Sequence, residues 1–374
     1  MSRFVDWLRL LREGAETRAG TRAMTKRAAD AKREEFMQVL RLAAVAAATS
    51  VLGLSTAFSA DYTLRIQTHY APEQTSGKLA QQFVDDVEAM SGGRIDIELF
   101  FSSSVVKSVE TFDAAASGIL DGDMTGGAYQ TGKNPAFQFV GDIMGGYDTP
   151  WQQYAWLYYG GGYDAANELY NEYNMQLIGW WVYGQESMTS SRPIAGPADL
   201  KDWKFRSPPG LETEIFAELG AKPVVMDFTE VFTALETGII DGADYSGLAN
   251  NKSIGLFDLV KHATYPGFHS MPSDHLAIRK DAWDALPEDL QRIIEVAMQK
   301  LAFQTALTFE VENNKAAAAL REQGVTLHDW SAEDRAAFRG AAQRAWQGWA
   351  DKTPEARALV DSHTAFLKTL GLVQ

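Results

Sequence analysis

Two copies of one short pattern, 120 residues apart, constrain the fold of this chain most. Residues 112–122 read FDAAASGILDG and residues 232–242 read FTALETGIIDG, which agree at six of eleven positions. Each copy predicts a helix that ends at a glycine, Gly118 or Gly238, followed by a short buried strand. The repeat predicts two lobes of similar topology around a cleft, the usual frame of a hinged binding protein. Common helix-ending chemistry is the alternative explanation for the agreement.

Alternating strand and helix patterns place the chain in the α/β class. A strand-like run, TLRIQTHY, is followed by a helix over residues 79–90, the strand RIDIELFF and a helix over residues 108–117. Residues 175–191 form a long strand-like run that can cross from one lobe to the other. A second crossing strand lies in HSMPSDHLAIRKDAWDALP, before a helix that begins at Asp281. The expected fold is therefore two α/β lobes joined by crossing strands.

Helical patterns dominate the end of the chain, over residues 287–323, 332–352 and 354–370. We expect four parts: an N-terminal extension and signal segment (1–60), lobe I (61–183 plus 271–300), lobe II (184–270 plus 301–331), and C-terminal helices (332–374). These last helices exceed what two lobes need. They either pack on their own chain or form a dimer contact.

Residues 42–60, LAAVAAATSVLGLSTAFSA, form an uncharged apolar run that ends in small residues. This pattern is typical of a secretory signal segment and its cleavage zone. A transmembrane anchor of minimal length is the alternative, but Ala, Ser and Thr dominate and no basic cluster follows. We expect a periplasmic protein that is cut after Ser59 or Ala60. The charged stretch before the run makes Met24 and Met37 alternative starts.

The net charge of −15 and the lack of a basic stripe exclude nucleic acid as an expected partner. Residues 61–374 hold 24 Lys+Arg against 43 Asp+Glu. An acidic shell does not attract anions at long range, so an anionic ligand needs a local site. The absence of cysteine excludes thiol catalysis, disulfides and thiolate metal sites.

Arg206 is the first candidate for such a local site. It lies at the end of the strand-like KFRS run, just before the break at Pro208, Pro209 and Gly210. In open α/β sheets, ligands collect beyond the carboxyl ends of strands, so this guanidinium is expected to face a pocket. A surface arginine in an ion pair is the alternative.

Other polar and aromatic residues are weaker candidates. Tyr129 follows two glycines just after the first copy of the repeat, and Gln185 and Glu186 lie in the first crossing run, where the cleft floor is expected. His269 and His275 have a spacing that fits neither one helix face nor a usual zinc site, so we interpret them as structural or pocket residues. No nucleophile paired with a base is legible, which disfavours the alternative of an exported α/β enzyme.

The span over residues 197–242 resembles the substrate-binding proteins of tripartite ATP-independent periplasmic (TRAP) transporters. The runs LKDWKFRSPPG, GAKPVVMDFTEVFTALETGIIDGAD and AIRKDAWDALPEDLQ match that family's pattern in order and spacing. The resemblance implies a type II-like, two-lobed periplasmic binding protein with crossing strands and a long helix. It also implies a receptor, not an enzyme, that delivers a carboxylate-bearing solute to a TRAP membrane permease.

The resemblance also implies roles for individual residues. In that family the arginine matching Arg206 pairs with the ligand carboxylate. The GQES run, the Asp-Tyr pair and the long C-terminal helices resemble the branch that binds 2-oxo or 2-hydroxy monocarboxylates with a cation, here sodium or calcium. In that branch residues matching Gln185, Asp244 and Tyr245 hold the metal, and a C-terminal helix is exchanged in a homodimer. The acidic position is commonly Glu there, and Asp244 is one methylene shorter. The expected ligand-binding residues are Arg206, Gln185, Tyr129, Trp181, Tyr245 and His269.

Overall fold

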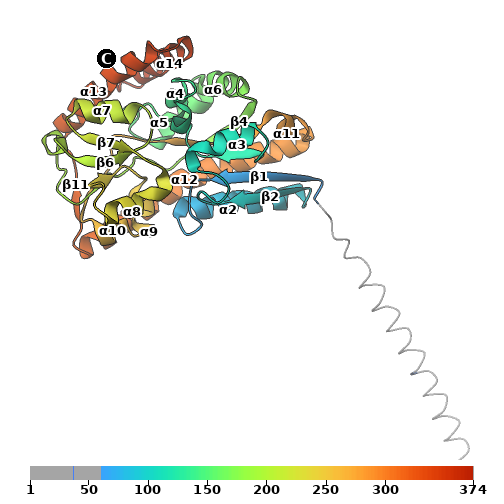
Figure 1. Ribbon diagram of the computed structural model, residues 1–374. Helices are drawn as coiled ribbons and strands as arrows, with labels where there is room; N and C mark the ends of the chain where they lie inside the picture. The colour runs from blue at the N-terminus through green and yellow to red at the C-terminus, as the bar shows by residue number, and fades with distance from the viewer. Residues whose placement is uncertain (1–36, 38–59, 374) are drawn as a thin grey trace, which may run out of the picture. The chain divides into compact units, whose positions relative to one another are not determined.

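The first of two mixed sheets has the strand order β2-β1-β3-β10-β4 (Figure 1). The structure is a computed structural model that describes Met37 and residues 60–373. The strands of this sheet are β1 (Tyr62–Thr68), β2 (Ile95–Phe100), β3 (Gly122–Met124), β4 (Met175–Val182) and β10 (Ser273–Arg279). β1 pairs in parallel with β2 and β3, and β10 is antiparallel to β3 and β4.

The second sheet has the order β11-β9-β5-β8-β6-β7. Its strands are β5 (Thr189–Ser190), β6 (Lys204–Ser207), β7 (Lys222–Val225), β8 (Gly242–Ala243), β9 (His262–Thr264) and β11 (Thr326–His328). β6 pairs in parallel with β7 and β8, and β5 is antiparallel to β8 and β9. The series β7-β6-β8-β5-β9 therefore repeats the topology of β2-β1-β3-β10-β4, and the α/β class with two similar sheets is confirmed.

The two copies of the repeat occupy equivalent places in these sheets. Helix α3 (Thr111–Ala116) precedes β3, and α8 (Val231–Glu236) precedes β8. Gly118 and Gly238 end the two helical segments with φ angles of 87° and 69°, a left-handed conformation that glycine adopts readily. The predicted helix, glycine and short buried strand are therefore present in both copies.

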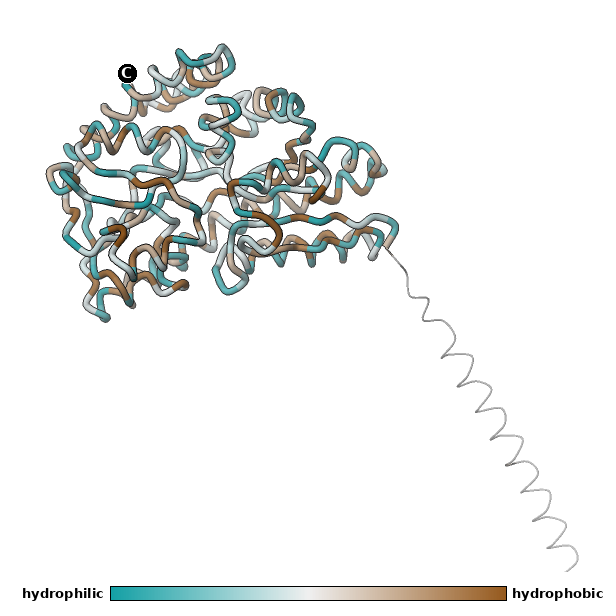
Figure 2. Tube along the Cα trace, viewed as in Figure 1, coloured by the Kyte–Doolittle hydropathy of each residue, from teal (hydrophilic) through white to brown (hydrophobic). Residues whose placement is uncertain are grey.

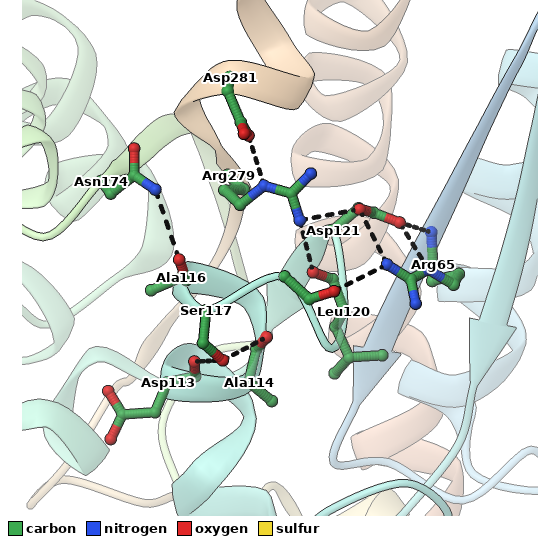
Figure 3. A network of polar contacts seen from close by, with 11 residues as sticks. Arg65, Asp113, Ala114, Ala116, Ser117, Leu120, Asp121, Asn174, Arg279 and Asp281 are labelled. Atoms are coloured by element: carbon green, nitrogen blue, oxygen red, sulfur yellow. Dashed lines mark hydrogen bonds and ion pairs between the residues drawn. The ribbon is translucent and has the colours of Figure 1, made fainter.

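The aspartate of each copy bonds the equivalent strand of its own sheet, β1 in the first and β6 in the second. Asp121 Oδ2 accepts the backbone N–H of Arg65 at 3.1 Å, and Asp241 Oδ2 accepts that of Lys204 at 3.3 Å. In the first sheet, Figure 3 shows the side chains of Arg65 and Arg279 converging on Asp121, at 2.8 Å and 3.1 Å. Burial acts to raise the pKa of Asp121, but its bonds to Arg65 outweigh burial and hold that pKa below its usual range. One carboxylate thus connects β1, β3 and β10.

The chain passes between the sheets three times. β4 is followed by β5 in the other sheet, β9 is followed by β10, and the long helix α12 (Glu288–Glu322) packs against β4 of the first sheet and β11 of the second. The expected single strand over residues 175–191 is wrong in one respect, because it is two strands separated by residues 183–188. Gly184 has a φ of 92° in this interval, which takes the backbone out of the extended conformation.

The C-terminal helices α13 (Ala332–Ala350) and α14 (Pro354–Thr369) pack on their own chain (red in Figure 1). They contact α7 (Leu211–Glu218), α4 (Phe137–Gly141) and α6 (Gly162–Asn171). Remaining helices are α2 (Thr75–Ser91), α5 (Pro150–Tyr159), α9 (Leu248–Ser253), α10 (Leu256–Leu259) and α11 (Lys280–Asp284), with short 3-10 turns at Ser108–Glu110, Gly127–Gln130, Pro197–Leu200 and Phe228–Glu230.

Hydrophobic residues recur along the strands and helices around both sheets (brown in Figure 2). They form two buried clusters, one of which includes residues of α13 and α14 such as Trp346 and Leu359. The predicted signal segment lies outside the described residues except for Ala60. No helix in the described part of the chain is long and apolar enough to cross a membrane.

Candidate functional site

A cavity of about 60 Å³ lies at the carboxyl ends of β1, β6 and β8. Residues on or beside both sheets line it. Beside the first sheet these include His69 after β1, Tyr129 of the turn Gly127–Gln130 and Asp274 of β10, and beside the second Arg206 of β6 and Asp244 and Tyr245 after β8. A buried water needs roughly 10–15 Å³ of such space, so the cavity has room for about four to six water-sized groups. Its size suits a small solute of a few heavy atoms.

Arg206 lines the cavity near the end of β6, and its side chain is 2% exposed. Its Nη1 donates to the carbonyl oxygen of Asp244 at 2.9 Å, and its Nε donates to that of Met226 at 3.4 Å. Burial raises the pKa of the Tyr129 hydroxyl, and the adjacent Arg206 acts in the opposite direction. Within the described residues these two hydrogen bonds go to carbonyls rather than to a carboxylate. The guanidinium therefore remains available to an anionic group.

Several carboxylates surround this arginine. Asp244 follows β8, and its Oδ1 lies 3.1 Å from Nε2 of His269. Burial acts to raise the pKa of Asp244, but contacts with His269 and Arg206 hold that pKa below its usual range. Burial and the charge of Asp244 raise the pKa of Glu186 and of Glu212 well above their usual range. Asp244 thus carries the negative charge of this cluster, while burial beside it favours the neutral forms of Glu186 and Glu212.

The acidic side of the cavity fits a cation. Glu186, Asp244 and His269 each offer one ligand atom, and these atoms lie within 4.8 Å of one another. Oδ1 of Asp244 is oriented by His269, and carboxylate oxygens are the donors that hard cations such as calcium prefer. Nδ1 of His269 and Oε1 of Glu212 have no hydrogen-bond partner in the described part of the chain. The donor set leaves room for a positive charge beside Asp244.

The structure brings four of the expected residues to the cavity wall: Arg206, Tyr129, Asp244 and Tyr245. His269 does not line the cavity, but it contacts Asp244, which does. Gln185 and Trp181 are not placed on this wall, contrary to expectation. Nε2 of Gln185 donates to the carbonyl of Tyr147 at 2.8 Å, and Gln185 lies in a separate depression beside Arg335.

Strand geometry explains both differences. Trp181 is fully buried in β4, where its ring packs in the core 5.5 Å from the ring of Tyr70. After β4 the left-handed Gly184 changes the direction of the chain, so Glu186 rather than Gln185 reaches the cavity. Beside Asp244, Glu186 and His269 offer the grouped carboxylate and imidazole donors. The metal-ligand roles of Gln185 and Tyr245 stay predictions, and Tyr245 does line the cavity.

Four acidic or basic residues of the cavity were missed as candidates: His69, Asp142, Glu212 and Asp274. His69 directly follows β1, so the rule that selected Arg206 would also have found it. Glu212 lies in the first turn of α7 and reads as an ordinary helix-start acid. Burial raises the pKa of Asp142 to about 7, and no sequence signal marks this residue as buried.

Comparisons with known proteins agree on one family. The family model described as bacterial extracellular solute-binding protein, family 7, matches residues 66–353. A monocarboxylate 2-oxoacid-binding periplasmic protein of Nostoc sp. is 26% identical over 352 residues, which cover 89% of this chain and 94% of that protein.

Two solved structures of TRAP periplasmic solute-binding proteins are similar to this chain. One from Rhodobacter sphaeroides, in an apo open form, is 36% identical with a TM-score of 0.67, covering 83% of this chain and 99% of that one. One from Pseudoalteromonas atlantica, with bound sodium and pyruvate, is 26% identical with a TM-score of 0.76, covering 83% of this chain and 94% of that one.

Proposed function

Because the chain belongs to the bacterial extracellular solute-binding proteins of family 7, we propose that it is a periplasmic receptor for a small organic acid. The solute is a 2-oxo or 2-hydroxy monocarboxylate, and the receptor delivers it to a TRAP membrane permease. The carrying observation is the buried Arg206 at the end of β6, whose hydrogen bonds leave it without a carboxylate partner in the described residues.

The energetics of Arg206 support an anionic ligand. A buried guanidinium is costly unless an opposite charge pairs with it, and a bidentate carboxylate supplies two charge-assisted hydrogen bonds. The cavity volume of about 60 Å³ supports an acid of a few heavy atoms. The relatives from Nostoc sp. and Pseudoalteromonas atlantica, which bind 2-oxoacids and pyruvate, support the same class.

A cation completes the proposed site. Asp244 and Glu186 supply carboxylate oxygens for it, with His269 orienting Asp244, and the solute's own oxygens complete the shell. A bound sodium or calcium ion would offset the repulsion between these acids and an anionic solute. The sodium reported with pyruvate in the Pseudoalteromonas atlantica protein supports this arrangement.

Calorimetry on Arg206 variants tests the proposal. Arg206→Lys keeps the charge but loses the planar fork, so pyruvate or lactate affinity should fall by about tenfold to a hundredfold. Arg206→Ala should weaken binding further, because each charge-assisted hydrogen bond contributes about 1.5–3 kcal/mol. Arg192→Ala, at an arginine outside the cavity lining, is the matched control. If Arg206→Ala binds pyruvate or lactate with wild-type affinity, Arg206 does not pair with the ligand carboxylate, and that part of the proposal is wrong.

The receptor role also excludes turnover. The matched family consists of solute-binding proteins, which supports a receptor over the alternative of an exported enzyme. Pyruvate or lactate incubated with the protein should be recovered unchanged, with the amount bound equal to the amount later released. Chemical conversion of the bound acid would favour the enzyme.

A further inference from the structure

One cavity-lining side chain has no function in the proposed site. His69 directly follows β1, lines the cavity and is 4% exposed. Neither of its ring nitrogens has a hydrogen-bond partner in the described residues. Its nearest carboxylate is Asp274, whose Oδ2 lies 3.5 Å from Nε2 without hydrogen-bond geometry. A buried imidazole with two unpaired nitrogens costs free energy unless a ligand pairs with it.

The imidazole is held in place by three aromatic rings. It stacks on Phe228 with ring centroids 4.8 Å apart, and it meets the rings of Tyr70 and Tyr129 edge-on at 4.2 Å and 5.7 Å. The hydroxyl of Tyr70 in turn donates to Asp274 Oδ2 at 2.6 Å. These contacts fix the ring without using its nitrogens, so the nitrogens are available for recognition.

His69 and Arg206 reach the cavity from different sheets. His69 follows the carboxyl end of β1, and Arg206 lies at the carboxyl end of β6, the strand that occupies the equivalent place in the second sheet. Phe228 contacts both residues, with its ring stacked on His69 and its centroid 5.9 Å from Cζ of Arg206. A small solute that contacts Arg206 is therefore within the same aromatic enclosure as His69.

We propose that His69 pairs with the oxygen substituent of the bound acid while Arg206 holds its carboxylate. This inference rests on the proposed function and deepens it. His69 then makes the receptor bind 2-oxo and 2-hydroxy acids more tightly than carboxylic acids without an oxygen substituent. A site built to hydrogen-bond a substituent rejects an analogue that lacks it, because the site's buried polar group is then left unpaired.

Calorimetry with three acids of equal carbon number tests His69: propionate, pyruvate and lactate. Wild type should bind pyruvate or lactate at least about tenfold more tightly than propionate, the effect of one buried hydrogen bond. His69→Phe keeps a ring against Phe228 and removes both nitrogens. It should reduce this preference to about one while leaving propionate affinity within about threefold. His69→Gln, which retains a hydrogen-bonding group, should keep part of the preference.

The controls separate recognition from structure. An equal loss for all three acids in His69→Phe, or an unchanged preference, would overturn the role of His69. His262→Phe, on β9 outside the cavity lining, should leave all three affinities unchanged. If His69→Phe fails to fold by circular dichroism, the His69→Gln series decides: a preference equal to wild type overturns the inference, and a reduced one supports it.

Two further measurements distinguish this inference from its premise. If none of the acids binds wild type, or Arg206→Ala binds them normally, the proposed function fails and His69 is not the cause. Repeating the titrations in chelator separates His69 from a cation that binds the same oxygen. A preference that survives His69→Phe and disappears with chelator would assign the substituent to the cation instead.

Discussion

Asp244 illustrates how neighbours set the charge of one side chain. Burial alone would neutralise it, yet His269 and Arg206 keep its pKa below the usual range. It therefore stays ionised inside a cavity that is proposed to hold an anion. An ionised carboxylate in that position repels the solute unless a cation lies between them.

Asp244→Asn should consequently weaken metal-dependent binding. We expect a loss of about tenfold to a hundredfold in pyruvate affinity with sodium or calcium present, because one charged ligand of the cation is removed. Calorimetry with the metal and with chelator measures the difference. Asp258→Asn, at an exposed position on α10, should behave like wild type. Tighter binding of Asp244→Asn in chelator than in metal would contradict the bridging cation.

Only part of the cavity was predictable at this scale. Arg206 was found because it lies at a strand end, where backbone pattern and position agree, whereas Asp244 and Tyr245 were named through the resemblance to the TRAP family. Gln185 and Glu186 were both candidates, and Gln185 was preferred through the family resemblance. The left-handed Gly184 before them sets which side chain reaches the cavity, and a sequence does not show that turn. Glu212 was missed because its burial depends on how α7 meets the cavity, which a sequence does not record.

At the scale of elements, the repeat could be recognised in the sequence because the backbone conformation and strand spacing at its glycines require that residue type. Gly122 lies where an added Cβ would come within 3.0 Å of the Ile66 side chain, and Gly242 where it would come within 2.3 Å of the carbonyl of Thr189. Glycine is required for such close approach of neighbouring strands. The packing of α14 was left open, because an amphipathic helix shows that it has a partner without showing which one.

The position of α14 gives a prediction for pH. Nε2 of its His363 donates to the carbonyl of Phe139 at 2.7 Å, Nδ1 lies 2.9 Å from the hydroxyl of Tyr147, and the ring stacks on Trp156. Burial lowers the pKa of His363 to about 3. The unfolded chain, with a histidine pKa of about 6.5, binds more protons between these values, so stability falls as pH decreases below about 6.5.

Between pH 6.5 and 5 this group should lower the unfolding free energy by about 1.6 kcal/mol, because its slope rises from about 0.7 to about 1.4 kcal/mol per pH unit as the unfolded chain is protonated. Urea unfolding at several pH values measures the slope. His363→Gln keeps hydrogen-bonding groups without titrating. Between pH 6.5 and 5 its loss of unfolding free energy should therefore be smaller than that of wild type by that amount. Equal slopes for His363→Gln and wild type would contradict the assignment.

At the scale of the whole molecule, the homodimer stays a prediction, but we now expect its contact on α12 rather than on the C-terminal helices. The described parts of α13 and α14 bury apolar side chains in their own chain. Three of the exposed apolar side chains, Phe303, Leu307 and Val311, instead lie on α12, and the ring of the exposed Trp151 is 5.8 Å from that of Phe303. Spacings of four residues place these α12 side chains on one stripe.

Phe303→Glu should therefore shift the protein from dimer to monomer without loss of acid binding, since a charge in an apolar contact is costly. Light scattering at micromolar concentration measures the mass. Gln82→Glu, exposed on α2, adds the same charge elsewhere and should leave the dimer intact. Wild-type protein that is monomeric at this concentration would end the prediction.

The position of β10 has a consequence for the order of folding. This strand lies between β3 and β4, although about 90 residues separate it from β4 along the chain. During synthesis the first sheet therefore lacks one of its inner strands until β5–β9 of the second sheet have been made. Neither sheet can be completed on its own, because β10 and β11 are the last strands to be made. The chain can therefore remain an extended, unfolded polypeptide until late in synthesis, and we expect the two sheets to complete their folding together.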